Sequence, residues 1–473
     1  MLELTLVESE DIGVVGVGEA TIPPVRTYHK LAAVDERAFM RASQATFKLG
    51  IAFENWGRPG DRYIHSFGRL GLSTWMADFF QIYLEGRRRG LVEDEVGAYC
   101  LEWKAAEAER FATGGEPELN YAYHLDAALY GRHLRGLCEA RGVRRIEGKI
   151  VEVEQDPDSG FIRALRLEDG RRVEGDFFLD CTGLRGLLIE QTLGTGFEDW
   201  SHWLPMDRAL AVQTRALRPA PPYTRSIAHA AGWQWWIPLQ NRVGNGLVYC
   251  SAHLSDEEAA DTLMAHIEGE TLNTPRLIRF RTGRRRQVWN KNCLAVGLSS
   301  GFLEPLESTS IHLIQNAVHR FMRLFPFHGV TPALVERYNR LARQEIEAIR
   351  DFIILHYKVT EREDSPFWRD CRHMAVPDTL ALRIALFEQN ALAFQDGEEL
   401  FAIDSWIQVM LGQRLAPGGH HLFARMMTDQ QLRGALDGLR RKVEARIGAL
   451  PPHDRFVREY CAAEAAPSPA PTG

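Results

Sequence analysis

The first residues of the chain carry the pattern that decides its fold: Leu2–Val7 (LELTLV) is a short apolar run, Glu8 closes it, and Gly13–Pro23 (GVVGVGEATIP) follows. An apolar strand that ends in a carboxylate is typical of the second strand of a dinucleotide-binding unit. In that position the carboxylate accepts a hydrogen bond from a ribose hydroxyl. We therefore expect Leu2–Val7 to be a strand and Glu8 to face a nucleotide.

Such a unit normally begins with another strand, a G-x-G-x-x-G turn and a helix, together about 30 residues. None of them precedes Leu2 in this sequence. The pattern therefore predicts an N-terminally truncated unit, in which the turn that binds pyrophosphate lies upstream of Met1. It also predicts an unpaired edge on the Leu2–Val7 strand.

Strand and helix patterns alternate further along the chain. Thr46–Trp56 alternates with period two, which predicts a single strand that carries Lys48 on its small-residue face. Leu125–Arg141 has helical spacing, and residues 143–180 contain short β-runs separated by turn signals.

The second half of the chain is mostly helical in pattern, including Ser308–Leu324 and Pro332–Lys358. The whole order predicts an α/β chain with a doubly wound, monooxygenase-like flavoprotein fold, an inserted β-sheet and a helical C-terminal substrate region. We expect three parts: a core at 1–325 that lacks its first βα unit and includes the substrate-side sheet, a helical region at 326–461, and a disordered tail at 462–473.

Composition excludes several classes of protein. The chain has 473 residues, of which 45% are hydrophobic and 25% charged, and a formal net charge of −7, which argues against a nucleic-acid binder. No run approaches the roughly 18 apolar residues of a membrane span and no secretory leader is evident, so we expect a cytoplasmic protein that does not bind membranes. The seven cysteines are scattered without zinc-ligand spacing, and we expect no metal site.

A candidate anion site lies at the start of the Ser308–Leu324 helix. Ser308 is the expected cap, and the backbone N–H groups near Thr309 and Ser310 would then be free to bind a small anion. Glu307 stands beside them. Taken alone, Glu307 is better explained as a carboxylate that complements the helix dipole.

Two further features have an ordinary structural interpretation when taken singly. Lys48 could be a solvated strand lysine. Trp233, Trp235 and Trp236 could be core residues, although three tryptophans within four residues are unusual for filling a core. In a strand, Trp233 and Trp235 would point to the same side.

Four motifs occur in order along the chain: Gly16–Pro23, Phe47-Lys48, Trp233–Pro238 (WQWWIP) and Glu304–Thr309 (EPLEST). Together they resemble the flavin-dependent tryptophan halogenase family. The resemblance extends over nearly the whole chain, to about Arg369, and it rests mainly on the W-x-W-x-I-P signature and on Lys48 and Glu307 occurring together.

This resemblance implies a reaction. Reduced FAD, delivered by a separate NAD(P)H-dependent flavin reductase, reacts with oxygen to give a flavin hydroperoxide, which chloride or bromide attacks to form hypohalous acid. That oxidant passes through a tunnel to an aromatic substrate. A homodimer is a further possibility.

The resemblance also implies residue roles. Lys48 holds the oxidant or is itself halogenated, and Glu307 assists it or removes the ring proton. The halide lies on the backbone of Thr309 and Ser310. The expected FAD-binding residues are Glu8, Gly16, Gly18, Glu19, Ala20, Ile150, Leu298 and Ile314. The residues expected along the tunnel are Trp233, Trp235, Ile237 and Pro238, and the two tryptophans are expected to keep the substrate away from the flavin.

Two departures from the family pattern keep alternatives open. Ser310 stands where the family usually has glycine, and the first glycine turn is absent. A flavin-dependent monooxygenase and a non-catalytic fragment that cannot bind FAD are therefore the competing interpretations.

The substrate is expected to be an electron-rich aromatic of indole type. Ser405–Gln413 occupies the region of the amino-acid clamp of free-tryptophan halogenases, but its residues do not match that clamp. This disfavours free tryptophan and leaves indole, a substituted indole and a carrier-bound or larger aromatic open.

Overall fold

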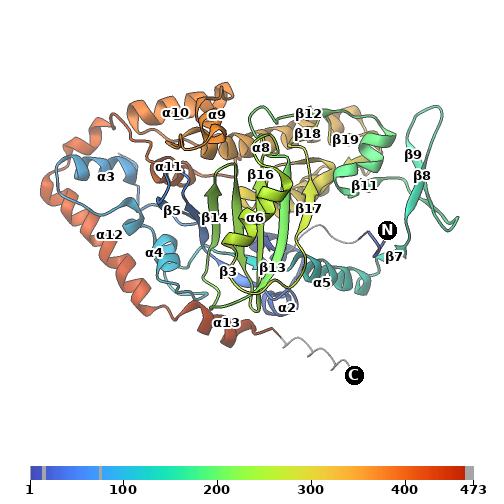
Figure 1. The fold of residues 1–473 in the computed structure, drawn as a ribbon. Helices are drawn as coiled ribbons and strands as arrows, with labels where there is room; N and C mark the ends of the chain where they lie inside the picture. Colours follow the sequence, from blue (N-terminus) through green and yellow to red (C-terminus); the bar gives the residue numbers. More distant parts are fainter. Residues whose placement is uncertain (1, 13–17, 74–76, 464–473) are drawn as a thin grey trace.

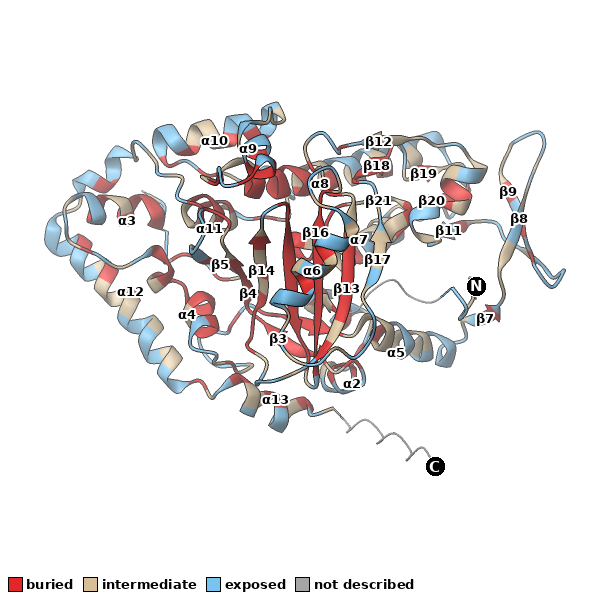
Figure 2. Ribbon diagram, viewed as in Figure 1, coloured by how far each residue is buried: buried red, intermediate tan, exposed pale blue. Residues whose placement is uncertain are grey.

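A computed structural model gives the fold, and it describes residues 2–12, 18–73 and 77–463 (Figure 1). Gly16 and nearly all of the expected tail lie outside the described residues. The described chain is a mixed α/β protein, with a large central sheet and helices around it. Figure 2 shows that the burial is concentrated in the central strands, while α12 (Asp429–Ala449) at the left and α5 (Ala127–Ala140) expose much of their surface.

The central sheet has seven strands, in the order β17-β13-β16-β15-β14-β4-β5. All of its neighbouring strands are antiparallel except β14 and β4, which are parallel. Every residue of β15 and β16 is buried, because helices and smaller sheets cover both faces. The bounds of the strands are Arg276–Arg279 (β17), Arg208–Arg215 (β13), Arg242–Tyr249 (β16), Gly232–Pro238 (β15), Thr224–His229 (β14), Gly50–Glu54 (β4) and Arg62–Ser66 (β5).

The expected single strand Thr46–Trp56 is wrong, because the chain divides at Leu49. β3 (Thr46–Lys48) pairs with β6 (Ala122–Leu125) in a three-stranded sheet that also contains β2 (Glu19–Ala20), whereas β4 belongs to the central sheet. The break occurs because the Leu49 amide donates to the Pro222 carbonyl over 2.7 Å. Lys48 therefore does not share a face with the small residues of β4.

Two small parallel pairs of strands lie outside the central sheet, and one of them contains the expected first strand. β1 (Thr5–Glu8) pairs with β7 (Arg144–Glu147), and β11 (Phe178–Asp180) pairs with β20 (Cys293–Ala295). β19 (Trp289–Asn290) adds an antiparallel strand to the second pair. Among the strands that the structure describes, β1 has a neighbour on one side only, and no strand joins the two pairs.

The remaining strands form two peripheral sheets. One contains β8 (Ile150–Gln155), β9 (Ile162–Leu167) and β10 (Arg172–Glu174), and the other contains β12 (Phe197–Asp199), β18 (Gly283–Arg285) and β21 (Gly301–Phe302).

The described helices surround these sheets. The largest cluster of buried side chains runs from Phe53 on β4 through Trp233 on β15 to Phe352 on α8. The other helix bounds are Pro24–Leu31 (α1), Glu36–Ala42 (α2), Phe79–Arg88 (α3), Leu101–Glu107 (α4), Asp256–His266 (α6), Ser310–Arg323 (α7), Pro332–Lys358 (α8), Pro366–His373 (α9), Asp378–Asn390 (α10), Ile403–Gly412 (α11) and His453–Cys461 (α13).

The expected cap of α7 is wrong by one residue. The N-cap is Thr309, and Ser308 instead has a left-handed backbone with φ of 58°. This conformation ends the 3₁₀ turn Pro305–Glu307 and turns the chain into α7. A non-glycine residue in the left-handed region is strained, and such strain is often found at functional sites.

The C-terminal helix α13 closes over β3. The His453 ring accepts a hydrogen bond from the Phe47 amide at Nε2 (3.3 Å), and its Nδ1 contacts the Ala220 carbonyl at 2.7 Å. Phe456 packs against Phe47, with their ring centroids 5.6 Å apart. The residue before Lys48 is thus fixed by a segment more than four hundred positions away.

Candidate active site

Lys48 and the turn that carries Glu307 meet in the interior of the protein. The Lys48 side chain is fully buried, and its Nζ donates to Ser308 Oγ over 2.8 Å and to the Thr21 carbonyl over 3.2 Å. The Phe67 ring lies 5.3 Å from the Lys48 ammonium. Burial lowers the pKa of Lys48 to about 7, although nearby Glu307 acts in the opposite direction. A solvated strand lysine is thereby excluded.

The Glu307 carboxylate lies between two histidines. Its Oε2 is 2.9 Å from His65 Nδ1 on β5, and its Oε1 is 2.7 Å from His356 Nε2 on α8. Burial alone would raise the pKa of Glu307, but the two histidines lower it to about 2. Glu307 is therefore ionised at neutral pH and is oriented by imidazoles on both oxygens.

His356 is itself fixed by its neighbours. Its Nδ1 lies 3.2 Å from the Tyr63 hydroxyl, its backbone carbonyl accepts from Gln413, and its ring stacks on Phe53 with centroids 4.6 Å apart. Burial lowers the pKa of His356, while Glu307 opposes that change. We did not predict either histidine, since their association with Glu307 exists only in the folded chain.

The N-terminus of α7 presents backbone amides beside this site. Thr309 is buried, Ser310 is the first helical residue, and no side chain in the described structure caps the helix. Unpaired N–H groups at the N-terminus of a helix form a site for small anions. Thr309 and Ser310 directly follow Ser308 in the chain, and Ser308 is the residue that accepts the hydrogen bond from Lys48.

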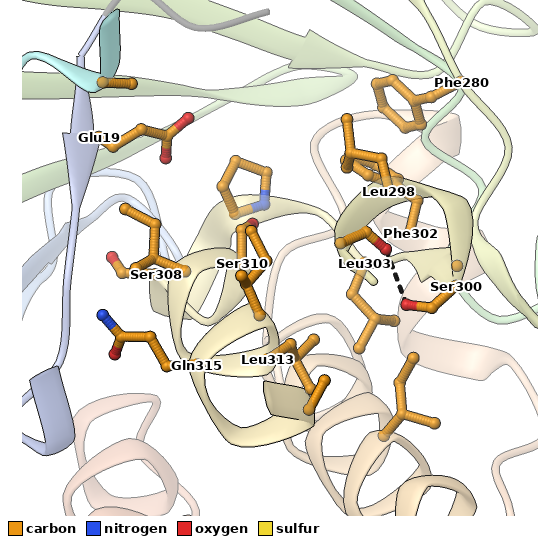
Figure 3. A pocket seen from close by; sticks show the side chains of 18 of the residues that line it. Glu19, Phe280, Leu298, Ser300, Phe302, Leu303, Ser308, Ser310, Leu313 and Gln315 are labelled. Atoms are coloured by element: carbon orange, nitrogen blue, oxygen red, sulfur yellow. Dashed lines mark hydrogen bonds between the residues drawn. The ribbon is translucent and has the colours of Figure 1, made fainter. Parts of the chain in front are cut away.

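A cavity of about 510 Å³ leads to the same turn. In Figure 3, Glu19, Ser308 and Gln315 lie along one side of this cavity, and Leu298, Phe280 and Phe302 lie along the other. Burial raises the pKa of Glu19 to about 7. The expected site residues that line the cavity are Gly18, Glu19, Ala20, Trp233, Trp235, Ile237, Leu298, Ser310 and Ile314.

Three expected cofactor or tunnel residues lie elsewhere. Glu8 accepts hydrogen bonds from Arg145 and Arg135, and Ile150 packs beside the hydrophobic cluster around Phe178. Pro238 contributes its carbonyl, which accepts from the Thr46 hydroxyl over 2.7 Å.

The tryptophan motif forms one wall of the cavity. The ring centroids of Trp233 and Trp235 are 6.3 Å apart, and both rings face the cavity, as alternation along β15 predicts. The Trp235 ring covers Gly246, where an added Cβ would lie only 2.0 Å from the ring. An apolar, aromatic cavity of this size suits a planar ring system such as a flavin.

Metal-ligand clusters and membrane-spanning helices are both absent from the described part of the chain. Within residues 2–12, 18–73 and 77–463, no group of three or more His, Cys, Asp or Glu side chains is arranged to hold a metal ion. In the same residues, every helix is too short or too polar to cross a membrane.

Comparison with known proteins assigns a family. A family model described as tryptophan halogenase matches residues 1–429. Over 426 residues the chain is 36% identical to the tryptophan 6-halogenase SttH of Streptomyces toxytricini, which corresponds to 85% of this chain and 81% of that protein.

Solved structures agree with this result. Xcc4156, a flavin-dependent halogenase from Xanthomonas campestris, superposes with a TM-score of 0.97 at 53% identity, over 98% of this chain and 94% of that one. BrvH, a flavin-dependent halogenase from Brevundimonas sp. BAL3, gives a TM-score of 0.93 at 43% identity, over 97% and 93% of the two chains. The expected FAD-binding α/β fold is thus confirmed.

Proposed function

Because the chain belongs to the tryptophan halogenase family and is a flavin-dependent halogenase, we propose that it halogenates an electron-rich aromatic of indole type at the site formed by Lys48 and Glu307. The observation that supports this site most strongly is the shared burial of Lys48, Glu307 and Ser308, in which Lys48 Nζ donates to the hydroxyl of Ser308, the residue that follows Glu307. A buried lysine with a lowered pKa beside an ionised carboxylate is typical of a catalytic site.

The enzyme uses FADH2 supplied by a separate flavin reductase, together with chloride or bromide. Reduced flavin bound in this cavity would supply the redox chemistry that converts oxygen and halide to hypohalous acid. Leu298, Ile314, Trp235 and the Gly18–Ala20 segment would hold it, since they line an apolar cavity that suits its ring system. Gly297 also lines this cavity with φ of +69°, a conformation that favours glycine there.

The remaining roles follow from the positions of the side chains. The Lys48 ammonium donates a hydrogen bond to the oxygen of hypohalous acid, which makes the halogen more electrophilic. A ring carbon of the substrate then attacks the halogen, so that a carbon–halogen bond forms and the halogen–oxygen bond breaks. The departing hydroxide takes a proton from the Lys48 ammonium and leaves as water. Glu307 accepts the proton that the ring carbon loses, and aromaticity returns.

We propose a small indole as the substrate, in preference to free tryptophan. Three polar side chains of the α11 segment have partners within the protein, which supports this choice: Gln408 contacts the Ser66 amide and hydroxyl, and Gln413 donates to the His356 carbonyl. Asp404 accepts from the Leu70 amide. These groups are therefore not free to bind an amino-acid backbone. SttH, by its name, acts on tryptophan, and that substrate is the alternative.

The test is product analysis with FADH2 and bromide. Wild-type enzyme should convert indole to a product with the bromine isotope pattern, and more readily than it converts free tryptophan. An oxygenated product without halogen would instead support the monooxygenase interpretation, and no product would support the non-catalytic one.

We propose a cytoplasmic location and a possible homodimer. We also propose that residues 1–325 form the flavin-binding and halogenating core, and that residues 326–461 form a helical region beside the substrate.

A further inference from the structure

A second carboxylate, Glu304, links the tryptophan wall of the cavity to the Glu307 turn. The Glu304 side chain is fully buried, and its Oε2 accepts hydrogen bonds from Trp233 Nε1 (2.7 Å) and from the Tyr357 hydroxyl (2.6 Å). Glu304 is also the N-cap residue of the 3₁₀ turn that carries Glu307. Glu304 thus binds Trp233 through its side chain, and its backbone begins the turn that carries Glu307.

Trp233 differs in this respect from its two neighbours on β15. Within the described residues, the indole N–H groups of Trp235 and Trp236 have no hydrogen-bond partner, whereas that of Trp233 has Glu304. An indole carries one donor and no acceptor, so this bond is the only polar contact that can fix the ring. A bond to a carboxylate is roughly twice as strong as one between neutral groups.

The other partner of Glu304 is immobilised by aromatic packing. The Tyr357 ring lies 5.4 Å from Trp56 and 6.0 Å from Trp368, measured between centroids. Glu304 Oε1 has no partner in the described structure, and burial raises the pKa of Glu304 to about 7. The Glu304 carboxylate is therefore oriented through Oε2 alone, which accepts from the Trp233 indole and from the Tyr357 hydroxyl.

We propose that Glu304 is a positioning residue, which fixes the Trp233 ring against the cavity and thereby keeps hypohalous acid on its path to Lys48. This role of Glu304 rests on the proposed function, because it requires that the oxidant forms in the cavity that Trp233 lines. Its specific consequence is that Glu304 controls how much of the oxidant reaches the substrate, and not how fast flavin is oxidised.

The experiment measures brominated indole formed per FADH2 oxidised. Glu304→Leu removes both acceptors at similar volume, Glu304→Gln retains one carbonyl oxygen that can accept both bonds, and Tyr357→Phe removes the tyrosine bond alone. Since an unpaired buried donor costs about 1–3 kcal/mol, the ratio should fall about tenfold in Glu304→Leu and stay within about twofold in the other two variants. The KM for indole and the rate of FADH2 oxidation should be unchanged.

Two further variants, Trp233→Phe and Trp235→Phe, test whether Glu304 changes the ratio by acting on Trp233. Trp233→Phe removes the indole N–H and should by itself lower the ratio about as much as Glu304→Leu, which provides a test even if the leucine variant does not fold. Adding Glu304→Leu to Trp233→Phe should have no further effect, whereas adding it to Trp235→Phe should still lower the ratio.

Equal losses in Glu304→Leu and Tyr357→Phe would overturn the inference, as would a wild-type ratio in Glu304→Leu or in Trp233→Phe. A wild-type enzyme that makes no brominated indole would instead contradict the proposed function.

Discussion

The Lys48 ammonium donates a 2.8 Å hydrogen bond to the Ser308 hydroxyl, and this bond joins two residues that are 260 positions apart in the chain. It connects β3 to the turn that carries Glu307, so one buried contact joins the strand of Lys48 to the turn of Glu307, the two residues proposed for catalysis. Any change at Lys48 therefore acts on the reacting group and on its support.

Lys48→Met should abolish halogenation and leave flavin oxidation intact. The reason is that Lys48, in the proposed mechanism, acts on the oxidant after the flavin has reacted. We expect the yield of brominated indole to fall about a hundredfold or more. The rate of FADH2 oxidation should stay within about twofold of the wild-type rate. Lys30→Met, at an exposed position on α1, removes the same charge and should retain full activity. A near wild-type yield from Lys48→Met would remove Lys48 from the mechanism.

The burial of Lys48 should also appear in the pH dependence of stability. Its pKa is about 7 in the folded protein and 10.5 for an ordinary exposed lysine, so unfolding takes up a proton between these two pH values. The free energy of unfolding of the wild type should therefore rise with pH across this window, by up to about 1.4 kcal/mol per pH unit, relative to Lys48→Met. Denaturant titrations at about pH 7 and about pH 9.5, which span most of this window, measure the difference, and parallel behaviour of the two proteins would contradict it.

Glu307→Gln should lower the rate of halogenation by about two orders of magnitude or more, the contribution of a positioned general base. The amide keeps the shape of the side chain and cannot accept the ring proton. Glu363→Gln, on the protein surface, serves as the control. Unchanged turnover with a normal fold would favour the interpretation that Glu307 only complements the dipole of α7.

His356→Phe should shift the pH profile of halogenation. Glu307 would lose one of the two imidazoles that lower its pKa to about 2, so its pKa should rise by about one unit or more. Because the ionised form is the base, the acidic limb of the rate profile moves to higher pH. Phenylalanine can take over the stacking on Phe53, and Tyr63→Phe, which changes only the second neighbour, should shift the limb less. An unshifted limb in His356→Phe would show that the histidine does not act on Glu307.

Two substitutions at Ser310 separate its backbone from its side chain. Ser310→Gly retains the N–H group and should leave the KM for bromide within about twofold. Ser310→Pro removes the N–H group at the first helical position, where proline is tolerated, and should raise that KM about tenfold, since hydrogen bonds to charged groups contribute about 1.5–3 kcal/mol. Equal KM values for the two variants would place the halide elsewhere.

Local patterns predicted those parts of the fold that depend on neighbouring residues. The bounds of α8 agree with the predicted helix Pro332–Lys358, and β15 presents Trp233 and Trp235 to one side as alternation requires. The break at Leu49 could not be predicted, because the Leu49 amide donates to the carbonyl of Pro222, which is far away in the sequence. Ser308 likewise adopts a left-handed backbone that favours glycine or asparagine in most proteins.

The candidate site was predicted only in part for the same reason. Motifs identified Lys48 and Glu307, but the histidines on Glu307 come from β5 and α8, and no spacing in the chain connects them. Glu304 was visible in the EPLEST motif, yet nothing in the sequence distinguishes a carboxylate that holds an indole from one that faces water.

The bond between the Phe47 amide and His453 also bears on how the protein is made in the cell. A ribosome delivers β3 406 residues before it reaches His453 in α13, and domains generally fold in the order of their synthesis. Until residue 453 has emerged, the backbone next to Lys48 lacks one of its hydrogen-bond partners. The nascent chain should therefore acquire halogenating competence only after α13 has emerged, when the strands and helices that precede it have already been delivered.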